Sequence, residues 1–368
     1  MAIHFASVSY INSSLLGQFA GNGTLSILYI AGSLLAVMSL LLAPFLLRKF
    51  GSILVFLFFI VLEILAVFGM GNVSLAALVI FFFIIHLSAD SILYFCLDIN
   101  LEQETKVEGT TGSKRGVMLA ISNIAWVLSP LALVFLITQN SFSKVYLLSG
   151  IALIPLFFLV DMFFKNTKKA SAAASNITLA IRSLWKGRDK ARVIGIQFIL
   201  NFFYSWMVIY LPLLLNKEVG LGWDKIGFMF VIMLLPFLLF ELPAGILSDK
   251  KIGEKEILIG GILIMSFATF LIPTISSSVF WIWATILFVT RIGAALVEIS
   301  SESYFFKHVK EEDTGLIGLF RMTRPLSYVI SPLFAIPIIY FFSYSTSFYF
   351  LALFTLIGLF FIPKVDTR

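Results

Sequence analysis

Long apolar runs separated by short polar connections dominate the pattern of hydrophobic and polar positions along the chain. Runs of about 18 to 25 residues, each long enough to cross the hydrocarbon core of a bilayer, lie at 2–19, 24–47, 52–71, 74–97, 116–138 and 145–164, and then at 193–214, 225–247, 256–275, 279–303, 315–341 and 345–363. This pattern predicts an all-α polytopic membrane protein with about twelve transmembrane helices in two pseudo-symmetric halves of six.

The longest polar interruption divides the chain near its middle. We therefore predict an N-terminal six-helix half at 1–164, a cytoplasmic linker at 165–192 and a C-terminal six-helix half at 193–368. In the linker, Ile177, Ile181, Leu184 and Trp185 follow helical spacing among basic residues. That spacing is typical of an amphipathic helix at the membrane surface, and a solvated linker with a frayed helical end is the alternative.

Composition supports the membrane assignment. Hydrophobic residues make up 60% of the chain, charged residues only 12%, and the mean hydropathy is +1.02, which excludes an ordinary soluble domain. A single cysteine, Cys96, excludes an internal disulfide, and the spacing of His4, His86 and His308 indicates no metal site. No cofactor is expected, and no nucleotide-binding loop of the Gly-x-x-x-x-Gly-Lys-Ser/Thr kind is present.

The placement of the basic residues predicts the orientation in the membrane. Twenty of the 26 Lys and Arg residues fall in alternate connections, whereas the opposite connections hold only Lys144, Lys217 and Lys225. By the positive-inside rule the basic connections are cytoplasmic, so both termini are expected on the cytoplasmic side of the cell membrane. The net charge of +6 therefore indicates orientation and not nucleic-acid binding. The first run begins at Met1 without a basic flank, so the sequence leaves open whether a longer first helix is truncated.

The run at 279–303 carries ionisable residues. Arg291, Glu298 and Glu302 follow one another at spacings of seven and four, so on an α-helix they share one side. Gly293 next to them allows close approach of a neighbouring helix. A structural charge paired inside a helix bundle and a charge that lines a transport path are both compatible with this pattern, and the second is favoured because ionisable residues in membrane helices are usually functional.

Two further runs in the N-terminal half hold ionisable residues. Glu63 has no other charge on its run and needs a partner from elsewhere. His86 and Asp90 stand one helical turn apart, which is compatible with a proton-handling pair or with a satisfied core histidine.

The two halves repeat each other weakly. The segment from Gly116 matches the segment from Gly318, with the Ser-Pro pair at 129–130 on that at 331–332, and the segment ending at Gly51 matches more loosely the one ending at Gly253. Here the sequence resembles the major facilitator superfamily of secondary transporters. GILSDKKIG, from Gly245 to Gly253, resembles the family's Gly-x-x-x-Asp-Arg/Lys loop motif, and RIGAA from Arg291 resembles its intramembrane arginine motif. The first half departs from the motif, with Leu47 where the aspartate would stand.

This resemblance implies a fold in which the first, fourth, seventh and tenth spans surround a central cavity. The residues then expected at a substrate and proton cavity are Asn12, His86, Asp90, Asn201, Tyr204, Trp206, Arg291 and Glu298, and those expected at a cytoplasmic gate are Gly245, Asp249, Lys250 and Gly253. Within this cavity Arg291 is expected to pair in turn with Glu298 and with Asp90 or an anionic group of the substrate.

The expected function is secondary transport of a small solute by alternating access across the cytoplasmic membrane, without catalysis and with protons as a candidate coupling ion. The expected partners are the substrate and the lipid bilayer, and the protein is expected to act as a monomer. A non-transporting receptor or scaffold and a membrane-embedded enzyme are the alternatives. An enzyme would need clustered reactive groups at one membrane depth, and the sequence pattern indicates none.

Overall fold

The computed structural model describes residues 1–108, 121–137, 141–164, 188–250, 253–308 and 314–362. The regular elements in these ranges are helices, as the apolar pattern predicts. Contacts divide the chain into two compact units, Met1–Ala174 and Ser175–Arg368. The predicted linker helix around Ile177 to Trp185 lies outside the described residues.

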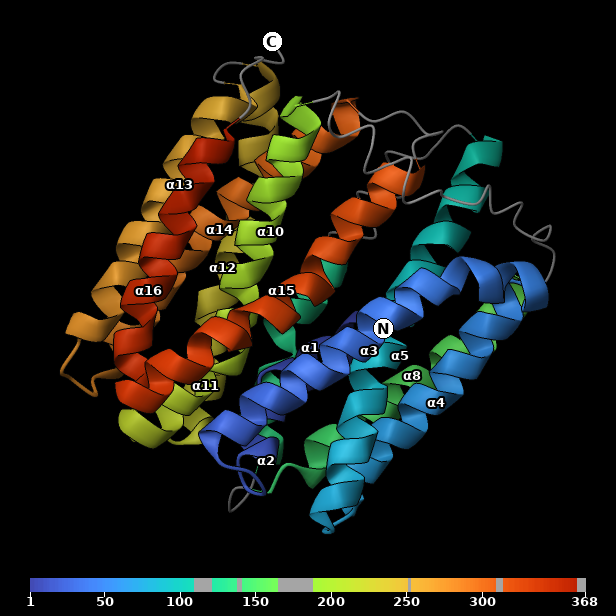
Figure 1. Ribbon diagram of the computed structural model, residues 1–368, viewed down its shortest axis with the longest axis horizontal. Coiled ribbons are helices and arrows are strands. Elements are labelled where there is room, and N and C mark those ends of the chain that lie inside the picture. The colour runs from blue at the N-terminus through green and yellow to red at the C-terminus, as the bar shows by residue number, and fades with distance from the viewer. Residues whose placement is uncertain (109–120, 138–140, 165–187, 251–252, 309–313, 363–368) are drawn as a thin grey trace. The chain divides into compact units, whose positions relative to one another are not determined.

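Seven helices of the first unit are described at both ends, and Figure 1 shows their arrangement. They are α1 (Ala2–Ser9), α2 (Asn12–Leu16), α3 (Asn22–Phe50), α4 (Ser52–Asn72), α5 (Ala76–Glu108), α7 (Leu131–Leu136) and α8 (Ser143–Phe164). Helix α4 packs between α5 and α8, α3 packs on α5, and α1 packs on α8. Phe56 and Ile60 of α4 meet Ile92 and Cys96 of α5 and Leu153 of α8 in a common apolar core.

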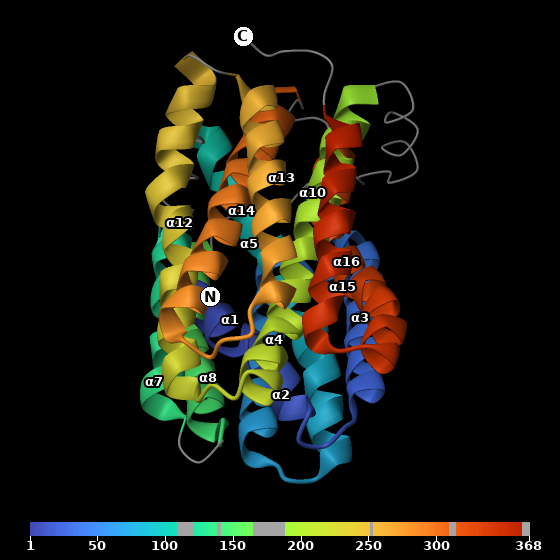
Figure 2. The same ribbon diagram turned by 90° about the vertical axis from the view of Figure 1, so that its left-hand side faces the viewer.

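The second unit follows the same kind of plan (Figure 2). Its helices are α10 (Arg188–Ile209), α11 (Leu211–Leu213), η1 (Leu214–Glu218), α12 (Trp223–Lys250), α13 (Glu254–Leu271), η2 (Ile272–Thr274), α14 (Phe280–His308), α15 (Thr314–Phe341), α16 (Tyr344–Leu356) and η3 (Ile357–Phe361). Helix α14 contacts α12, α13 and α10, while α15 packs on α10 and α16 on α13.

Ten of the described helices are long and apolar enough to cross a membrane, and the other two predicted spans differ from the prediction. The span expected at 2–19 is broken between α1 and α2 at Tyr10 and Ile11. In α1, the hydroxyls of Ser7 and Ser9 donate to the carbonyls of Ile3 and Phe5, at 2.6 and 2.7 Å. Such bonds to the preceding turn compete with regular helix geometry and favour bending.

The span expected at 116–138 is described only from residue 121, and the described part, Ile121–Leu136, is apolar and helical. A turn at Ser129 and Pro130 interrupts it. Proline lacks the amide hydrogen that would continue the helical ladder, and the Ser129 hydroxyl donates to the Ala125 carbonyl at 2.6 Å. The sequence repeat gave Pro332 the corresponding place, yet there α15 continues through the proline.

The weakly matched segments that end at Gly51 and Gly253 adopt the same backbone conformation. Gly51 precedes α4 with φ 87° and ψ 153°, and Gly253 precedes α13 with φ 88° and ψ 156°. This region of backbone space is open to glycine and essentially closed to other residues. The second and third spans of each unit are therefore joined through the same kind of glycine-dependent turn.

Helices α13 and α14 cross in backbone contact at Gly261 and Gly293. A Cβ at Gly293 would meet the Gly261 carbonyl oxygen and the Met265 backbone, neither of which can swing aside as a side chain could. Close approach of this kind gives membrane helices extensive van der Waals contact. Because Gly293 lies two residues from Arg291, the crossing also fixes the part of α14 that carries the arginine.

We predict that Gly293→Ala forces α13 and α14 apart and lowers the stability of the folded protein by about 1–3 kcal/mol. Gly260→Ala is the matched control, since a Cβ at Gly260 meets nothing within 4 Å and alanine favours the helix. Thermal unfolding of the purified proteins measures both. Equal stability of Gly293→Ala and wild type would contradict the proposed backbone contact.

Candidate functional site

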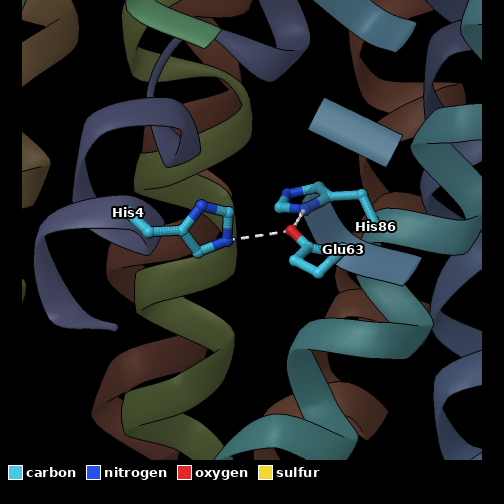
Figure 3. A group of neighbouring side chains, drawn as sticks. All are labelled: His4, Glu63 and His86. Atoms are coloured by element: carbon cyan, nitrogen blue, oxygen red, sulfur yellow. Dashed lines mark hydrogen bonds and ion pairs between the residues drawn. The ribbon is translucent and has the colours of Figure 1, made fainter. Parts of the chain in front are cut away.

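The described membrane helices bury ionisable side chains in both units. In the first unit, Glu63 of α4 lies between the imidazoles of His4 on α1 and His86 on α5 (Figure 3). Its Oε1 atom is 2.8 Å from His4 Nε2 and is also hydrogen-bonded to His86 Nδ1. All three side chains are fully buried. We refer to His4, Glu63 and His86 as the His–Glu–His triad.

Polar groups also contact the outer nitrogens of both imidazoles. His86 Nε2 lies 3.3 Å from the Asn12 amide nitrogen, and the Tyr146 hydroxyl donates to Asn12 Oδ1 at 2.6 Å. His4 Nδ1 lies 2.6 Å from the Ser149 hydroxyl oxygen. The triad is therefore the centre of a hydrogen-bond network that joins α1, α2, α4, α5 and α8.

This arrangement revises two expectations from the sequence. His86 uses its two ring nitrogens toward Glu63 and Asn12, so its hydrogen-bond partner is not Asp90, although Asp90 is buried on the same helix and close enough to act on His86 through its charge. The partner that Glu63 lacks on its own helix is supplied by two histidines, one of them 59 positions earlier in the chain. Glu63 without a nearby cation was the only sequence signal that pointed to such a contact.

The triad also brings together the donor types of a metal site, which the spacing of the histidines in the sequence did not indicate. Each of the three residues offers a ligand atom, all within 4.8 Å of one another. Tetrahedral ligands about 2.0–2.1 Å from a zinc ion would lie about 3.3 Å apart, whereas Glu63 Oε1 lies 2.8 Å from His4 Nε2 and closer still to His86 Nδ1. The spacing is that of hydrogen bonds.

In the second unit, Arg291 of α14 is only 1% exposed. Its guanidinium lies 5.1 Å from the ring centre of Phe203 and 5.5 Å from that of Tyr204, both on α10. Its Nε and Nη1 atoms are buried without a hydrogen-bond partner among the described residues. The two aromatic faces attract the cation, but they accept no conventional hydrogen bond from it.

Glu298 does not pair with Arg291, contrary to the expectation. Instead its carboxylate accepts a 2.5 Å hydrogen bond from the Tyr204 hydroxyl. Two helical turns separate Arg291 from Glu298, a rise of roughly 10 Å, so sharing one side of α14 does not bring their charges into contact. Glu302 contacts Arg321 of α15 at 3.4 Å instead.

Two other residues expected at the cavity make contacts that hold α10 in place. Asn201 donates from Nδ2 to the Gln197 carbonyl at 2.9 Å and to Thr323 Oγ1 on α15 at 3.0 Å. Trp206 donates to Ser347 Oγ on α16 at 3.3 Å and packs against aromatic rings in the apolar interior. Positions 204 and 206 point to different sides of a helix, which explains why Tyr204 meets Arg291 and Trp206 does not.

The expected gate residues are described only in part. Gly245, Asp249 and Lys250 belong to the last turns of α12, and their side chains lie outside the described residues. Gly253 forms the positive-φ turn before α13. The gate therefore stays a prediction.

The chain is similar to known proteins in part of its sequence and in its fold. The model of the Major Facilitator Superfamily matches residues 193–368. Two solved structures of the nucleoside transporter NupG match the chain. One, an aspartate-to-alanine mutant, has a TM-score of 0.75 and 14% identity and covers 98% of this chain and 96% of that one. The other has a TM-score of 0.75 and 13% identity over 98% and 94%. No curated protein matches.

Proposed function

We propose that the chain is a secondary transporter of the major facilitator superfamily, whose model matches residues 193–368, and that it carries a small solute with an anionic group, coupled to protons. Ten apolar helices long enough to cross a bilayer support a multi-pass membrane protein, and a small-molecule substrate is part of the proposal. Family and fold favour a transporter over an enzyme. Measured solute flux in proteoliposomes would exclude the alternative of a non-transporting receptor.

The observation that supports an anionic substrate is that Arg291 is buried while its Nε and Nη1 atoms have no hydrogen-bond partner among the described residues. A guanidinium stays charged even when buried, and a charge removed from water without a partner costs several kcal/mol. The described residues offer Arg291 two aromatic faces but no hydrogen-bond acceptor for Nε or Nη1. A carboxylate or phosphate group of a solute would supply paired acceptors in the planar geometry that arginine prefers.

We propose roles for the remaining residues around this anion site. The Tyr204 ring packs against the Arg291 guanidinium while the Tyr204 hydroxyl donates to Glu298. Tyr204 of α10 therefore contacts both the cation and the acid nearest to it along α14. Asp90 is the proposed partner of Arg291 when no solute is bound. In this proposal alternating access exchanges Asp90 for the solute, and Asn12, Asn201 and Trp206 keep their helices in place around it.

The proposed gate consists of Gly245, Asp249, Lys250 and Gly253. A carboxylate at Asp249 would be stabilised at the amino end of a neighbouring helix, where the helix dipole favours negative charge. If transport and inner-face accessibility in Asp249→Asn equal those of wild type, the gate proposal fails.

We predict that Arg291→Lys folds but loses transport of anionic solutes, because lysine keeps the charge without the planar pair of donors. Loss of charge-assisted hydrogen bonds worth about 1.5–3 kcal/mol corresponds to a fall of about 10-fold to 100-fold in apparent affinity. The measurement is uptake into proteoliposomes of a panel of small carboxylates, phosphate esters, nucleosides and sugars.

Arg321→Lys is the matched control for this experiment. Arg321 is a partly exposed arginine in the same unit, bonded to Glu302 at 3.4 Å, and its replacement should leave transport close to wild type. A folded Arg291→Ala protein with normal uptake would refute the anion site. Uptake of nucleosides or sugars but of no anionic solute would support the transport function and refute the proposed anionic substrate.

The proposed location is the cytoplasmic membrane with both termini inside, which rests on the distribution of Lys and Arg among the connections. We predict that a cysteine at Ser278, exposed between α13 and α14, reacts with a membrane-impermeant maleimide in intact cells. A cysteine at Ser171 in the basic connection should react only after the cells are opened. Replacing Cys96, the single cysteine, removes background labelling. The reverse pattern would invert the proposed orientation.

A further inference from the structure

We propose that the His–Glu–His triad is a proton-binding site enclosed within the first unit, and that the proton it takes up resides on His4 Nδ1. The triad would be a site for the proton coupling proposed above. Proton binding at the triad does not depend on that proposal, whereas a role of the triad in transport does. In the hydrogen-bond network His4 Nδ1 can gain a proton if one neighbouring hydroxyl, that of Ser149, rotates.

With the Asn12 amide oriented as it is in the structure, the network favours a neutral imidazole at His86. Tyr146 donates its hydroxyl hydrogen to Asn12 Oδ1 at 2.6 Å, so the Asn12 amide presents its NH₂ group to His86 Nε2. Nε2 therefore accepts, and the single ring proton sits on Nδ1, where it is donated to Glu63. A second proton on Nε2 would face the NH₂ group, so the Asn12 amide would have to turn over and the Tyr146 hydroxyl would have to change from donor to acceptor.

The surroundings of His4 adjust to an added proton by rotation of a single hydroxyl, whereas those of His86 require an amide to turn over. His4 Nε2 faces the Glu63 carboxylate at 2.8 Å, an ion-pair distance that favours a proton on Nε2, although the contact does not have the alignment of a regular hydrogen bond. In the neutral ring Nδ1 then accepts from the Ser149 hydroxyl at 2.6 Å. That hydroxyl has a second acceptor, the His4 backbone carbonyl, at 3.2 Å. If the hydroxyl rotates to this carbonyl, its oxygen is free to accept from a protonated Nδ1, so Nδ1 stays hydrogen-bonded in both protonation states of His4.

The charge of the triad supplies the driving force for binding a proton. Two neutral imidazoles around an ionised Glu63 leave one negative charge buried, and one further proton makes the group neutral overall. Burial of an uncompensated charge is strongly unfavourable. The proton is better placed on His4 than on the carboxylate, because Glu63 Oε2 has no hydrogen-bond partner among the described residues and a hydroxyl there would be unsatisfied.

Other titratable groups surround the triad and act on the same equilibrium. Among the described residues that interact with the triad they are the Met1 amino group, Asp90 on α5 and Tyr146 on α8. The negative charge of Asp90 favours proton uptake, whereas the positive Met1 amino group opposes it. Neither forms one of the hydrogen bonds that hold the extra proton, so their removal should shift the titration without abolishing it.

The direct test is ¹⁵N NMR of protein labelled at histidine, titrated between about pH 4 and pH 9 to cover the ordinary histidine range. The chain has three histidines, so His4→Gln and His86→Gln assign the signals. We expect His4 to change from one protonated nitrogen to two as the pH falls, while His86 keeps a single proton on Nδ1. A doubly protonated His86, or a His4 signal that does not change, would overturn the proposal.

Glu63→Gln tests the cause of proton uptake. Without the carboxylate charge His4 should stay neutral across the range. The matched control is Ser39→Ala, which removes a partly buried 2.7 Å contact to Ser88 in the same unit but no ionisable group, and should leave the His4 titration unchanged. If Glu63→Gln does not fold, the assignment of protons in the wild type still decides the proposal.

Two further measurements separate this site from its alternatives. Zinc ions that raise the melting temperature of the wild type but not of His4→Gln would overturn the proposal in favour of a metal site. Uptake driven by an imposed proton gradient tests the link to transport. If His4 titrates as expected and the gradient has no effect on wild-type uptake, the proton site stands and the proposed coupling fails.

Discussion

The cost of holding charge inside membrane helices constrains both halves of this protein, and the two halves meet that cost differently. In the first unit Glu63 lies between two imidazoles that can share protons with it. In the second, Arg291 lies against two aromatic faces and keeps hydrogen-bond capacity unused among the described residues. The first arrangement can become neutral by binding a proton, whereas the second can be completed only by an acceptor, because arginine does not give up its proton.

Helix packing determines where these charges lie. Gly261 and Gly293 let α13 and α14 meet backbone to backbone beside Arg291, and Asn201 joins α10 to α15 next to the rings that cover the guanidinium. The network in the first unit joins five helices around the triad. The polar groups thus replace part of the hydrophobic driving force that is absent between helices in lipid.

The fold was largely predictable from the sequence because span length and hydropathy are direct consequences of bilayer thickness. The structure differs from uninterrupted spans where side chains change the backbone locally: Ser7 and Ser9 bond the preceding turn before the break after α1, and Pro130 interrupts the described part of the fifth span. Both effects depend on local hydrogen bonds that a hydropathy pattern does not contain.

The sequence allowed most residues of the candidate site to be identified one by one, but it did not allow the contacts between them to be predicted. The sequence singled out His86, Arg291, Glu298 and Tyr204 because polar groups in apolar runs stand out. It paired Arg291 with Glu298 and His86 with Asp90, since it could count only positions along one helix. The observed partners, Tyr204 for Glu298 and His4 with Glu63 and His86, come from helices far apart in the chain. Such contacts follow from packing, which one sequence alone does not specify.

The most direct test of the central claim, that buried charge in the two halves serves proton-coupled movement of an anionic solute, is a measurement of proton flux driven by solute. The purified protein is reconstituted into vesicles without an imposed proton gradient, and a radiolabelled solute that it transports is added outside. The radiolabel reports solute uptake, and a pH-sensitive dye reports proton movement. The account predicts that protons move together with the solute in a fixed ratio. Solute uptake without any accompanying proton movement would contradict it.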